Sequence, residues 1–171
     1  MDFRNLKEFL KDASVYILVI IFVLFVVNYV FTFQQNVGPS MSPTLENGDA
    51  FILNKLAYKV GKIKRGNVVV INNNDSKYLV KRVIGLPGET LEYKDHILYI
   101  NGKKVDDKFA SITNDFSLEQ SFNIYKIPDN CYFVMGDNRG SSLDSRRLGC
   151  FTKDDIKGKV TFSLIPFKKV K

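Results

Sequence analysis

The sequence from Ala13 to Phe33, ASVYILVIIFVLFVVNYVFTF, decides the architecture of this chain of 171 residues. The run carries no formal charge, and Asn28 is its only strongly polar residue. The hydrocarbon core of a bilayer is about 30 Å thick, and roughly 20 helical residues are needed to cross it. The run is therefore long enough to span a membrane, and it predicts one transmembrane helix near the N-terminus.

A cleavable signal peptide and a buried core helix are the alternatives to a retained anchor. The apolar part of a signal peptide usually covers only about 7–15 residues and is followed by a small-residue site of the A-x-A type. The run from 13 to 33 is longer than that, and no such site follows it closely. A core helix of a soluble protein is rarely so uniformly apolar. We therefore interpret the run as an anchor.

The residues that flank the run predict its orientation. Arg4, Lys7 and Lys11 precede it, whereas residues 34 to 54 contain no lysine or arginine. Cations close to the end of a span favour the cytoplasmic side of the membrane. We therefore expect a single-pass protein of the cell membrane with a cytoplasmic N-terminus.

These boundaries divide the chain into a cytoplasmic segment at 1–12, the anchor at 13–33 and an extracytoplasmic domain at 34–171. The first segment has no net charge, so the formal net charge of +7 falls on the outer domain. A basic domain beside a bilayer is suited to anionic lipid headgroups, although a role in solubility explains the charge equally well. Aromatic spacing typical of nucleic-acid binding is absent from the sequence, so we expect membrane lipid and no nucleic acid as a partner.

The outer region has the sequence pattern of a β protein. Short runs of β-branched and aromatic residues predict strands, and turn signals separate them. Asn101-Gly102, for example, supplies the positive φ angles of a tight hairpin turn. A long amphipathic helical pattern does not occur after residue 34. The predicted strands are residues 51–54, 67–72, 78–84, 90–93, 97–100, 131–135 and 159–164.

We therefore expect a mainly β fold, in which an antiparallel β-sheet or partial barrel follows one N-terminal transmembrane helix. Within that domain, residues 86–130 form a hairpin and a longer excursion, because residues 106–126 show little periodic pattern.

The cysteines and the histidine limit the kinds of site. Cys131 and Cys150 are the two cysteines and His96 is the one histidine, and their spacing is not that of a metal centre, so we expect no metal and no cofactor. Outside the membrane the two cysteines either form a disulfide or stay as buried thiols, and we favour thiols. Asp95-His96 has the character of a hairpin turn, so we interpret His96 as an exposed turn residue and not as a catalytic base.

Lys81 is the remaining candidate for a catalytic base. Strand alternation places it on the same face as Leu79 and Val83. A lysine on a solvated face, with its apolar stem over its neighbours, is the alternative interpretation. In apolar surroundings, however, desolvation lowers the pKa of a lysine from about 10.4 by up to 3–5 units. The neutral amine then accepts a proton from a serine hydroxyl, as in a Ser-Lys dyad.

Four stretches of the outer region occur together in a characteristic order: PSMSPTL (39–45), GDAFILNKLAY (48–58), VKRVIGLPGE (80–89) and GDNRGSSLDSR (136–146). Behind an anchor, this combination resembles the bacterial type I signal peptidases, in their single-span Gram-positive form. The resemblance extends from the anchor to about residue 165. It implies a membrane-bound serine endopeptidase that uses a Ser-Lys dyad to remove signal peptides from exported preproteins, with cleavage after small residues.

The resemblance also implies roles for individual residues. Ser40 matches the nucleophile, and Lys81 matches the general base. Ser142 matches a serine whose hydroxyl helps to orient the lysine amine. The positions that support the site are Arg82, Asp137, Asn138, Asp144 and Arg146, and those that line small substrate pockets are Met41, Leu45 and Val80.

The segment around Ser40 contains further information. Pro39 and Pro43 restrict the backbone on either side of Ser40, so that its hydroxyl can be aimed at a bond close to the membrane surface. Ser42 is the rival nucleophile, but it fills a variable position of the family. Many Gram-negative members carry an oxyanion-binding serine two residues before the nucleophile, where this chain has Gly38. We expect the Ser40 backbone N–H to be one oxyanion donor, and the second donor remains unassigned.

The expected partners are the signal peptides of preproteins that emerge from the secretion machinery. Such a peptide would lie extended along strand edges near residues 34–40 and 78–81. A soluble self-cleaving repressor has a related Ser-Lys site, but the anchor and the lack of a DNA-binding helix pair argue against it. An inactive or accessory membrane-anchored β-domain that binds a secretion partner would keep the fold, yet it would have no use for the catalytic serine and lysine. A cell-surface structural protein explains these residues less well still.

Overall fold

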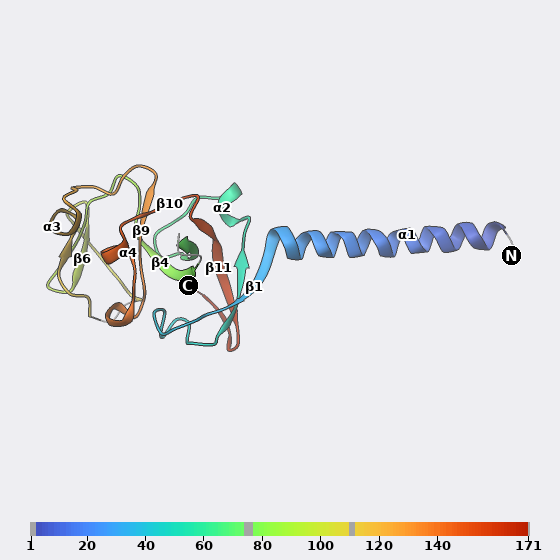
Figure 1. The fold of residues 1–171 in the computed structure, drawn as a ribbon, viewed down its shortest axis with the longest axis horizontal. Helices are drawn as coiled ribbons and strands as arrows, with labels where there is room; N and C mark the ends of the chain where they lie inside the picture. Colours follow the sequence, from blue (N-terminus) through green and yellow to red (C-terminus); the bar gives the residue numbers. More distant parts are fainter. Residues whose placement is uncertain (1–2, 74–76, 110–111, 171) are drawn as a thin grey trace.

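The computed structural model describes residues 3–73, 77–109 and 112–170. Helix α1 (Phe3–Phe25) continues into a π-helical turn, η1 (Val26–Val30), and the two project from the β domain (Figure 1). From Lys7 to Val30 this segment is long and apolar enough to cross a membrane, and none of it is buried against the domain. The structure therefore contains the predicted N-terminal candidate span. Residues 1 and 2 of the predicted segment 1–12 lie outside the described residues.

The helical segment ends at Val30, before the predicted end of the anchor at residue 33. Strand β1 (Phe31–Gln35) begins there and pairs antiparallel with β2 (Ala50–Asn54). A continuous apolar run has no periodicity that separates a helix from a strand, so the sequence does not mark this change. The consequence is that the chain passes directly from the anchor into the sheet.

The main sheet has eight strands in the order β1-β2-β11-β3-β4-β9-β10, and β12 pairs with β11. Its pairs are antiparallel, as predicted. Lys81 lies opposite Val69 of β3, and Arg82 lies between Val68 of β3 and Met135 of β9. Lys81 therefore lies in an interior strand of the sheet. The bounds are β3 (Val68–Asn73), β4 (Lys77–Gly85), β9 (Cys131–Met135), β10 (Phe151–Thr152), β11 (Ile156–Leu164) and β12 (Phe167–Lys169).

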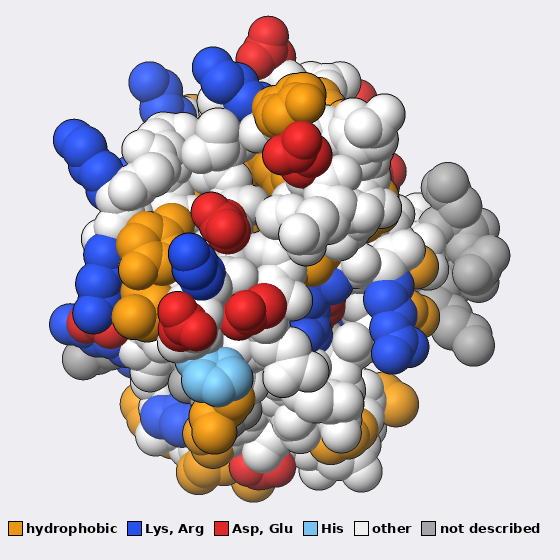
Figure 2. Space-filling view, turned by 90° about the vertical axis from the view of Figure 1, so that its left-hand side faces the viewer, with side chains coloured by type: hydrophobic (Ala, Val, Ile, Leu, Met, Phe, Trp, Pro, Cys, Tyr) orange, Lys and Arg blue, Asp and Glu red, His pale blue; other side chains and the backbone are white. Residues whose placement is uncertain are grey.

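A second, four-stranded sheet contains the hairpin that was predicted within residues 86–130, in the order β7-β6-β5-β8. Asp95 and His96 have positive φ angles in the turn between β5 and β6, and His96 is exposed, as predicted. This sheet lies at the end of the domain farthest from α1 (Figure 1), and Figure 2 looks onto that end, where basic, acidic and apolar side chains are interspersed. The bounds are β5 (Leu91–Lys94), β6 (Ile97–Ile100), β7 (Lys103–Val105) and β8 (Phe116–Ser117).

The helices that follow the anchor are short. They are α2 (Ala57–Val60), α3 (Leu118–Phe122), η2 (Arg139–Ser141) and α4 (Ser145–Leu148). The excursion at 106–126 contains β8 and α3, and its residues 110–111 lie outside the described residues.

Strand β3 separates two of the three buried apolar clusters. Val68 and Val70 pack with Phe51 and other residues in one cluster, whereas Val69 and Ile71 pack in another. Since successive side chains point to opposite faces of a strand, burial of both faces explains the continuous β-branched run at this place in the sequence. The third cluster joins the second sheet to β9.

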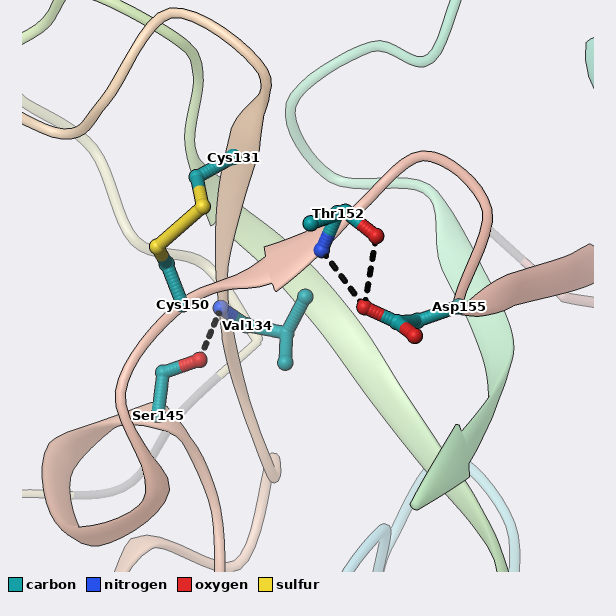
Figure 3. Close-up of a disulfide and its surroundings, with 6 residues drawn as sticks. All are labelled: Cys131, Val134, Ser145, Cys150, Thr152 and Asp155. Carbon is teal, nitrogen blue, oxygen red and sulfur yellow. Dashed lines mark hydrogen bonds between the residues drawn. A yellow bond between two sulfur atoms is a disulfide. The ribbon is translucent and has the colours of Figure 1, made fainter. Parts of the chain in front are cut away.

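The expectation that Cys131 and Cys150 stay as free thiols is wrong, because the structure joins them in a disulfide (Figure 3). Cys131 begins β9, and Cys150 directly precedes β10, which pairs with β9, so their Cα atoms lie 5.5 Å apart. This separation is typical of disulfides. The pairing depends on the two-residue strand Phe151–Thr152, which carries no sequence signal of its own. The bridge closes a loop that contains residues 136–146.

Candidate active site

The segment that carries Ser40 is a tight turn packed on the sheet. Pro39 O accepts a hydrogen bond from Ser42 N–H (3.1 Å), and Met41 O accepts one from Leu45 N–H (2.9 Å). The turn points the side chains of Met41 and Leu45 into an apolar cluster, where both are 0% exposed. Ser40 thus lies between Pro39 and the buried side chains of Met41 and Leu45, in a rigid segment as the sequence predicts.

Asn36, which the sequence analysis did not single out, closes the base of this turn. Its side chain is buried, and its amide donates to the backbone oxygens of Leu45 (3.2 Å) and Glu46 (2.9 Å). A buried amide is retained where it satisfies backbone acceptors that would otherwise have no partner. A single asparagine in a polar stretch gives no sequence signal for this role.

The Lys81 amine lies next to the Ser40 hydroxyl. Lys81 Nζ donates to Ser40 Oγ at 2.8 Å and to the backbone oxygen of Val80 at 2.9 Å. Lys81 is 3% exposed, which excludes the interpretation as a lysine on a solvated face. The rival hydroxyl of Ser42 instead donates to Glu46 Oε1 at 2.8 Å.

Burial lowers the pKa of Lys81 from 10.5 to about 8, against the opposing effect of the Asp144 and Asp137 carboxylates. An ammonium group loses hydration when it is buried, and this favours the neutral amine. With a pKa of about 8, about a tenth of the molecules carry a neutral amine at pH 7, and about half carry one at pH 8. The amine is therefore within reach of the protonation state that a general base requires.

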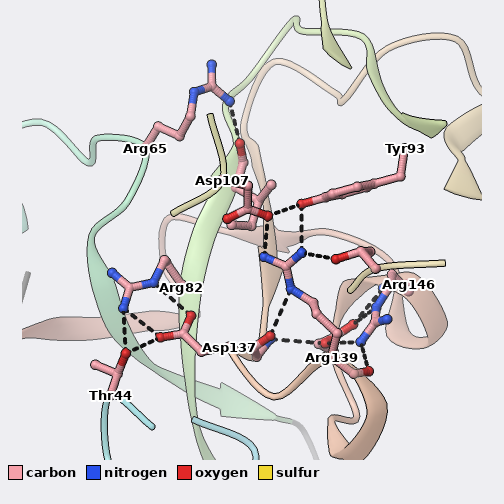
Figure 4. Close-up of polar contacts among 12 residues, drawn as sticks. Thr44, Arg65, Arg82, Tyr93, Asp107, Asp137, Arg139 and Arg146 are labelled. Carbon is pink, nitrogen blue, oxygen red and sulfur yellow. Dashed lines mark hydrogen bonds and ion pairs between the residues drawn. The ribbon is translucent and has the colours of Figure 1, made fainter. Parts of the chain in front are cut away.

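The turn at 136–146 lies against the Ser40 segment, and a buried ion pair between Asp137 of this turn and Arg82 of β4 connects it to the sheet (Figure 4). Arg82 donates to Asp137 in a bidentate arrangement, from Nε at 2.8 Å and from Nη2 at 2.6 Å, and both side chains are fully buried. Asp137 also accepts from the Thr44 hydroxyl at 2.5 Å. This ion pair therefore joins β4, the Ser40 segment and the turn. Thr44 was missed by the sequence analysis.

Asn138 contacts the Ser40 segment directly. Its backbone N–H donates to Ser40 O at 3.1 Å, and its side-chain amide donates to Pro39 O at 3.2 Å. Asp137 and Asn138 are thus neighbours in one turn that contacts the Ser40 segment.

Asp144 lies deeper in the same turn and pairs with Arg146. It accepts from Arg146 Nε and Nη2, each at 2.9 Å, and from Gly136 N–H at 3.0 Å. Burial alone would raise the pKa of Asp144, but the hydrogen bonds from Arg146 and Gly136 outweigh it and hold the pKa below its ordinary value. The carboxylate is therefore ionised, and it is one source of negative charge near Lys81.

Ser142 lies at the junction of the turn and the Ser40 segment. A Cβ atom at Gly136 would overlap with both Ser142 Oγ and Ser40 O, so the two segments meet over a position without a side chain. The Ser142 hydroxyl is buried and close enough to Asp144 to help lower the pKa of that carboxyl. It makes no hydrogen bond of normal geometry with a described residue, Lys81 included.

Arg139 connects this turn to the second sheet, and the sequence analysis did not assign it a role. Its buried guanidinium forms an ion pair with Asp107 (2.6 Å), accompanied by hydrogen bonds to the Tyr93 hydroxyl (2.9 Å) and Gly136 O (3.0 Å), as Figure 4 shows. The hydroxyl of Thr113 is a further acceptor. The only sequence signal for this residue is its place within GDNRG, since its partners lie far away in the chain.

A groove of about 600 Å³ lies in front of Ser40 and Lys81. In the described part of the chain, β1 pairs only with β2, and residues 78–81 of β4 pair only with β3, because β9 joins β4 from Arg82 onward. Each strand therefore presents a free edge to the groove. Of the three residues expected to line substrate pockets, Val80 does so, whereas Met41 and Leu45 lie in the core behind it. The other lining residues are Gln34, Gln35, Val37, Phe51, Tyr78, Leu79 and Leu143.

Two backbone N–H groups near Ser40 differ in availability. Gly38 N–H donates to Asn47 Oδ1 at 2.8 Å, and it is therefore already used. The N–H of Ser40 makes no hydrogen bond with any residue that the structure describes.

As for metals, the described residues contain no group of three or more histidine, cysteine, aspartate or glutamate side chains that could hold an ion.

Comparisons with known proteins agree on one family. The model of the family described as signal peptidase, peptidase S26, matches residues 6–165. Signal peptidase I of Bacillus caldolyticus is 44% identical over 151 residues, which cover 82% of this chain and 83% of that protein. Signal peptidase I S of Bacillus subtilis (strain 168) is 40% identical over 173 residues, 96% of this chain and 94% of that protein.

A solved structure is also similar. The crystal structure of a signal peptidase I from Enterococcus faecalis V583 superposes with a TM-score of 0.55 at 34% identity, and it covers 60% of this chain and 99% of that chain.

The lowered pKa of Lys81 predicts a pH-dependent cost in stability. The unfolded state binds the Lys81 proton more tightly than the folded state does. The resulting cost in stability is therefore at its full size below pH 8, and it disappears as the pH rises towards 10.5. We expect the stability advantage of Lys81→Met over the wild type to shrink by about 3 kcal/mol between pH 7 and pH 10.5. Urea unfolding in detergent, followed by circular dichroism, measures it.

The exposed Lys104 provides the matched control. The difference between Lys104→Met and the wild type should stay constant over the same pH range. A difference equally constant for Lys81→Met would show that the pKa of Lys81 is ordinary.

Proposed function

Because the chain belongs to the signal peptidase family, peptidase S26, and is thereby a serine peptidase that removes signal peptides, we propose that Ser40 is its nucleophile and Lys81 its general base. The observation that carries this proposal is the 2.8 Å contact between Ser40 Oγ and the buried amine of Lys81. A serine hydroxyl becomes a nucleophile when a neighbouring base accepts its proton, and a lysine with a lowered pKa is such a base.

The proposed reaction begins with the neutral amine of Lys81. It takes the proton of Ser40 as Oγ attacks the scissile carbonyl, and the backbone N–H of Ser40 donates to the oxyanion that forms. The Val80 carbonyl oxygen, 2.9 Å from Nζ, accepts an N–H of the amine and so helps to aim its lone pair at Ser40. The protonated Lys81 then gives its proton to the leaving amine of the mature protein, and an ester joins Ser40 to the signal peptide.

Deacylation uses the same lysine in the same order. Neutral Lys81 takes a proton from a water molecule that attacks the ester carbonyl, and it returns the proton to Ser40 as the Oγ–carbon bond breaks. The supporting residues take no part in these proton transfers. They are Ser142, Asp137, Asn138, Asp144, Arg146 and Arg82. They hold the dyad, and the second oxyanion donor stays unassigned because Gly38 N–H is engaged by Asn47.

The substrate in this proposal is an extended peptide. The free edges of β1 and of residues 78–81 in β4 face the groove, and a peptide added to a strand edge gains main-chain hydrogen bonds without regard to its sequence. Phe51 and Val80 place apolar side chains on the wall of the groove next to the dyad. We therefore propose cleavage after small residues in an A-x-A-like pattern.

We further propose that α1 anchors the chain in the cell membrane, with its N-terminus in the cytoplasm and the β domain outside. The apolar segment Lys7–Val30 and the cations before it support this orientation. Preproteins would then meet the groove as they leave the secretion machinery. An inactive accessory role is the alternative, but the buried Lys81 argues against it. A buried ammonium group lowers stability, and a protein without catalytic activity would gain nothing in return for that cost.

The dyad predicts a specific pattern of loss. We expect the wild type in detergent to cut a synthetic preprotein after the second alanine of A-x-A. Ser40→Ala and Lys81→Ala should each reduce cleavage by at least about 1,000-fold, because the nucleophile and its base act as a unit. Mass spectrometry of the products measures both the rate and the position of the cut.

His96→Ala is the control for this experiment, since His96 is exposed in a turn and should be dispensable. Cleavage that survives in Lys81→Ala, or that disappears in His96→Ala, would contradict the assignment. Circular dichroism shows whether each variant is folded.

A pair of glycine substitutions tests the contact between the turn and the Ser40 segment. A Cβ atom at Gly136 would overlap with Ser142 Oγ and Ser40 O, whereas one at Gly140 would meet nothing within 4 Å. Because a shift of about 1 Å can cost 100-fold in rate, we expect Gly136→Ala to lower kcat/KM about 100-fold or more. Gly140→Ala should stay within about twofold of the wild type. Equal activity of the two folded variants would show that this contact does not position Ser40.

A further inference from the structure

A second hollow of the β domain lies where the anchor enters it. This pocket of about 380 Å³ is lined by residues from η1, β1, β2, α2, β4 and β11. Its polar lining includes three lysines, Lys55, Lys59 and Lys157, and two tyrosines, Tyr29 and Tyr78, and none of the described aspartates or glutamates belongs to it. The proposed reaction makes no use of this pocket.

The three lysines of the pocket are not paired with acidic side chains in the part of the chain that the structure describes. Lys157 Nζ donates to the backbone oxygen of Asp154 at 3.0 Å, and the carboxylate of neighbouring Asp155 accepts from Thr152 instead. Lys59 and Lys157 are exposed. The pocket is thus a concave, cationic surface on the domain.

The pocket is fixed in position relative to the anchor. Lys55 Nζ donates to Asn28 O at 2.9 Å, and Lys55 N–H donates to Val30 O at 2.8 Å. These two bonds satisfy carbonyl groups at the C-terminal end of the helical segment, where a cation is also favoured. The base of the pocket and the end of the anchor are therefore one structure.

The length of the anchor places this structure at the membrane surface. The 24 residues from Lys7 to Val30, at 1.5 Å per residue, make a helix about 36 Å long, which exceeds the roughly 30 Å of the hydrocarbon core. The end of the helix at Asn28 and Tyr29 therefore reaches the headgroup region. Tyr29 and Tyr78 are 63% and 60% exposed, and tyrosine is enriched at this level of a bilayer.

We propose that this pocket binds the phosphate group of an anionic phospholipid headgroup. The inference rests on the proposed membrane anchoring of α1. Three lysines with no carboxylate partner among the described residues supply the charge that attracts a phosphate, and two exposed tyrosines suit the headgroup boundary. The bilayer delivers a lipid headgroup to this place, whereas a soluble phosphate must be drawn from bulk water.

The lipid would also hold the catalytic groove in a fixed position at the membrane. Gln34 and Tyr78 line both the cationic pocket and the groove that contains Ser40 and Lys81. A headgroup in the pocket would therefore fix the domain with the entrance of the groove beside the bilayer. A signal peptide that is still in the membrane would meet the groove there.

Binding of short-chain lipids to the full chain tests this proposal. Dihexanoyl phosphatidylglycerol, dihexanoyl phosphatidylcholine and inorganic phosphate are titrated separately into the protein in nonionic detergent, and dissociation constants are measured by thermophoresis. The test variant is Lys59→Gln with Lys157→Gln, because both side chains are exposed. The matched control, Lys103→Gln with Lys104→Gln, removes the same charge from exposed positions of the second sheet.

We expect phosphatidylglycerol to bind more tightly than phosphatidylcholine, and the test variant to weaken its binding by roughly thirtyfold, the effect of two cations on an anionic lipid. The control variant should bind like the wild type. Equal binding of both lipids, or an equal loss in both variants, would overturn the proposal, since the attraction would then be absent or spread over the whole domain. Equally tight binding of inorganic phosphate would overturn the assignment to a lipid.

Cleavage of a soluble A-x-A peptide, measured in the same samples, separates this inference from the proposed function. Both double variants should cut the peptide like the wild type, because their lysines lie outside the dyad and its supporting turn. A wild type that binds the lipid but cuts nothing would contradict the dyad and leave the pocket supported. A wild type that cleaves the peptide normally but does not prefer the anionic lipid would contradict the pocket and leave the dyad supported.

Discussion

The burial of one lysine amine is the constraint on which the rest of the structure depends. Lys81 must lose most of its hydration for its pKa to fall to about 8. Its place in β4, opposite Val69 of β3, provides that environment, and the Ser40 turn lies against the amine. The fold therefore maintains a group that lowers its own stability, which is common where a protein needs a reactive side chain.

A nucleophile is useful only if it stays in place, and here two chain segments hold it from opposite sides. Met41 and Leu45 fix the Ser40 turn to the core, while Asn138 binds its backbone from the turn at 136–146. That turn is itself held by the buried pair of Arg82 and Asp137. Through Arg139 it also depends on the second sheet, and through the disulfide it depends on β9. The outlying sheet thus contributes to the geometry of the site.

The sequence predicted the parts of this arrangement that local pattern controls. Each predicted strand is present: 97–100 and 131–135 have the predicted bounds, and the other five have shifted ends. The turn at Asp95-His96 is correct, and the motifs single out Ser40 and Lys81, whose side chains are in contact. Features that depend on long-range pairing were missed. The disulfide depends on the two-residue strand β10, and Arg139 forms its ion pair with a residue near the second sheet. Strand β1 begins within an apolar run, whose end shows no periodicity that would distinguish a strand from a helix.

The central claim is that the neutral amine of Lys81 is the catalytic base, and the pH dependence of kcat/KM for a soluble A-x-A peptide tests it most directly. Because the free enzyme must lose the proton of Lys81, kcat/KM should rise with pH, reach half its maximum near the pKa of about 8, and level off above it. A rise that disappears in His96→Ala would contradict the account, and so would a profile that is flat between pH 6 and 9.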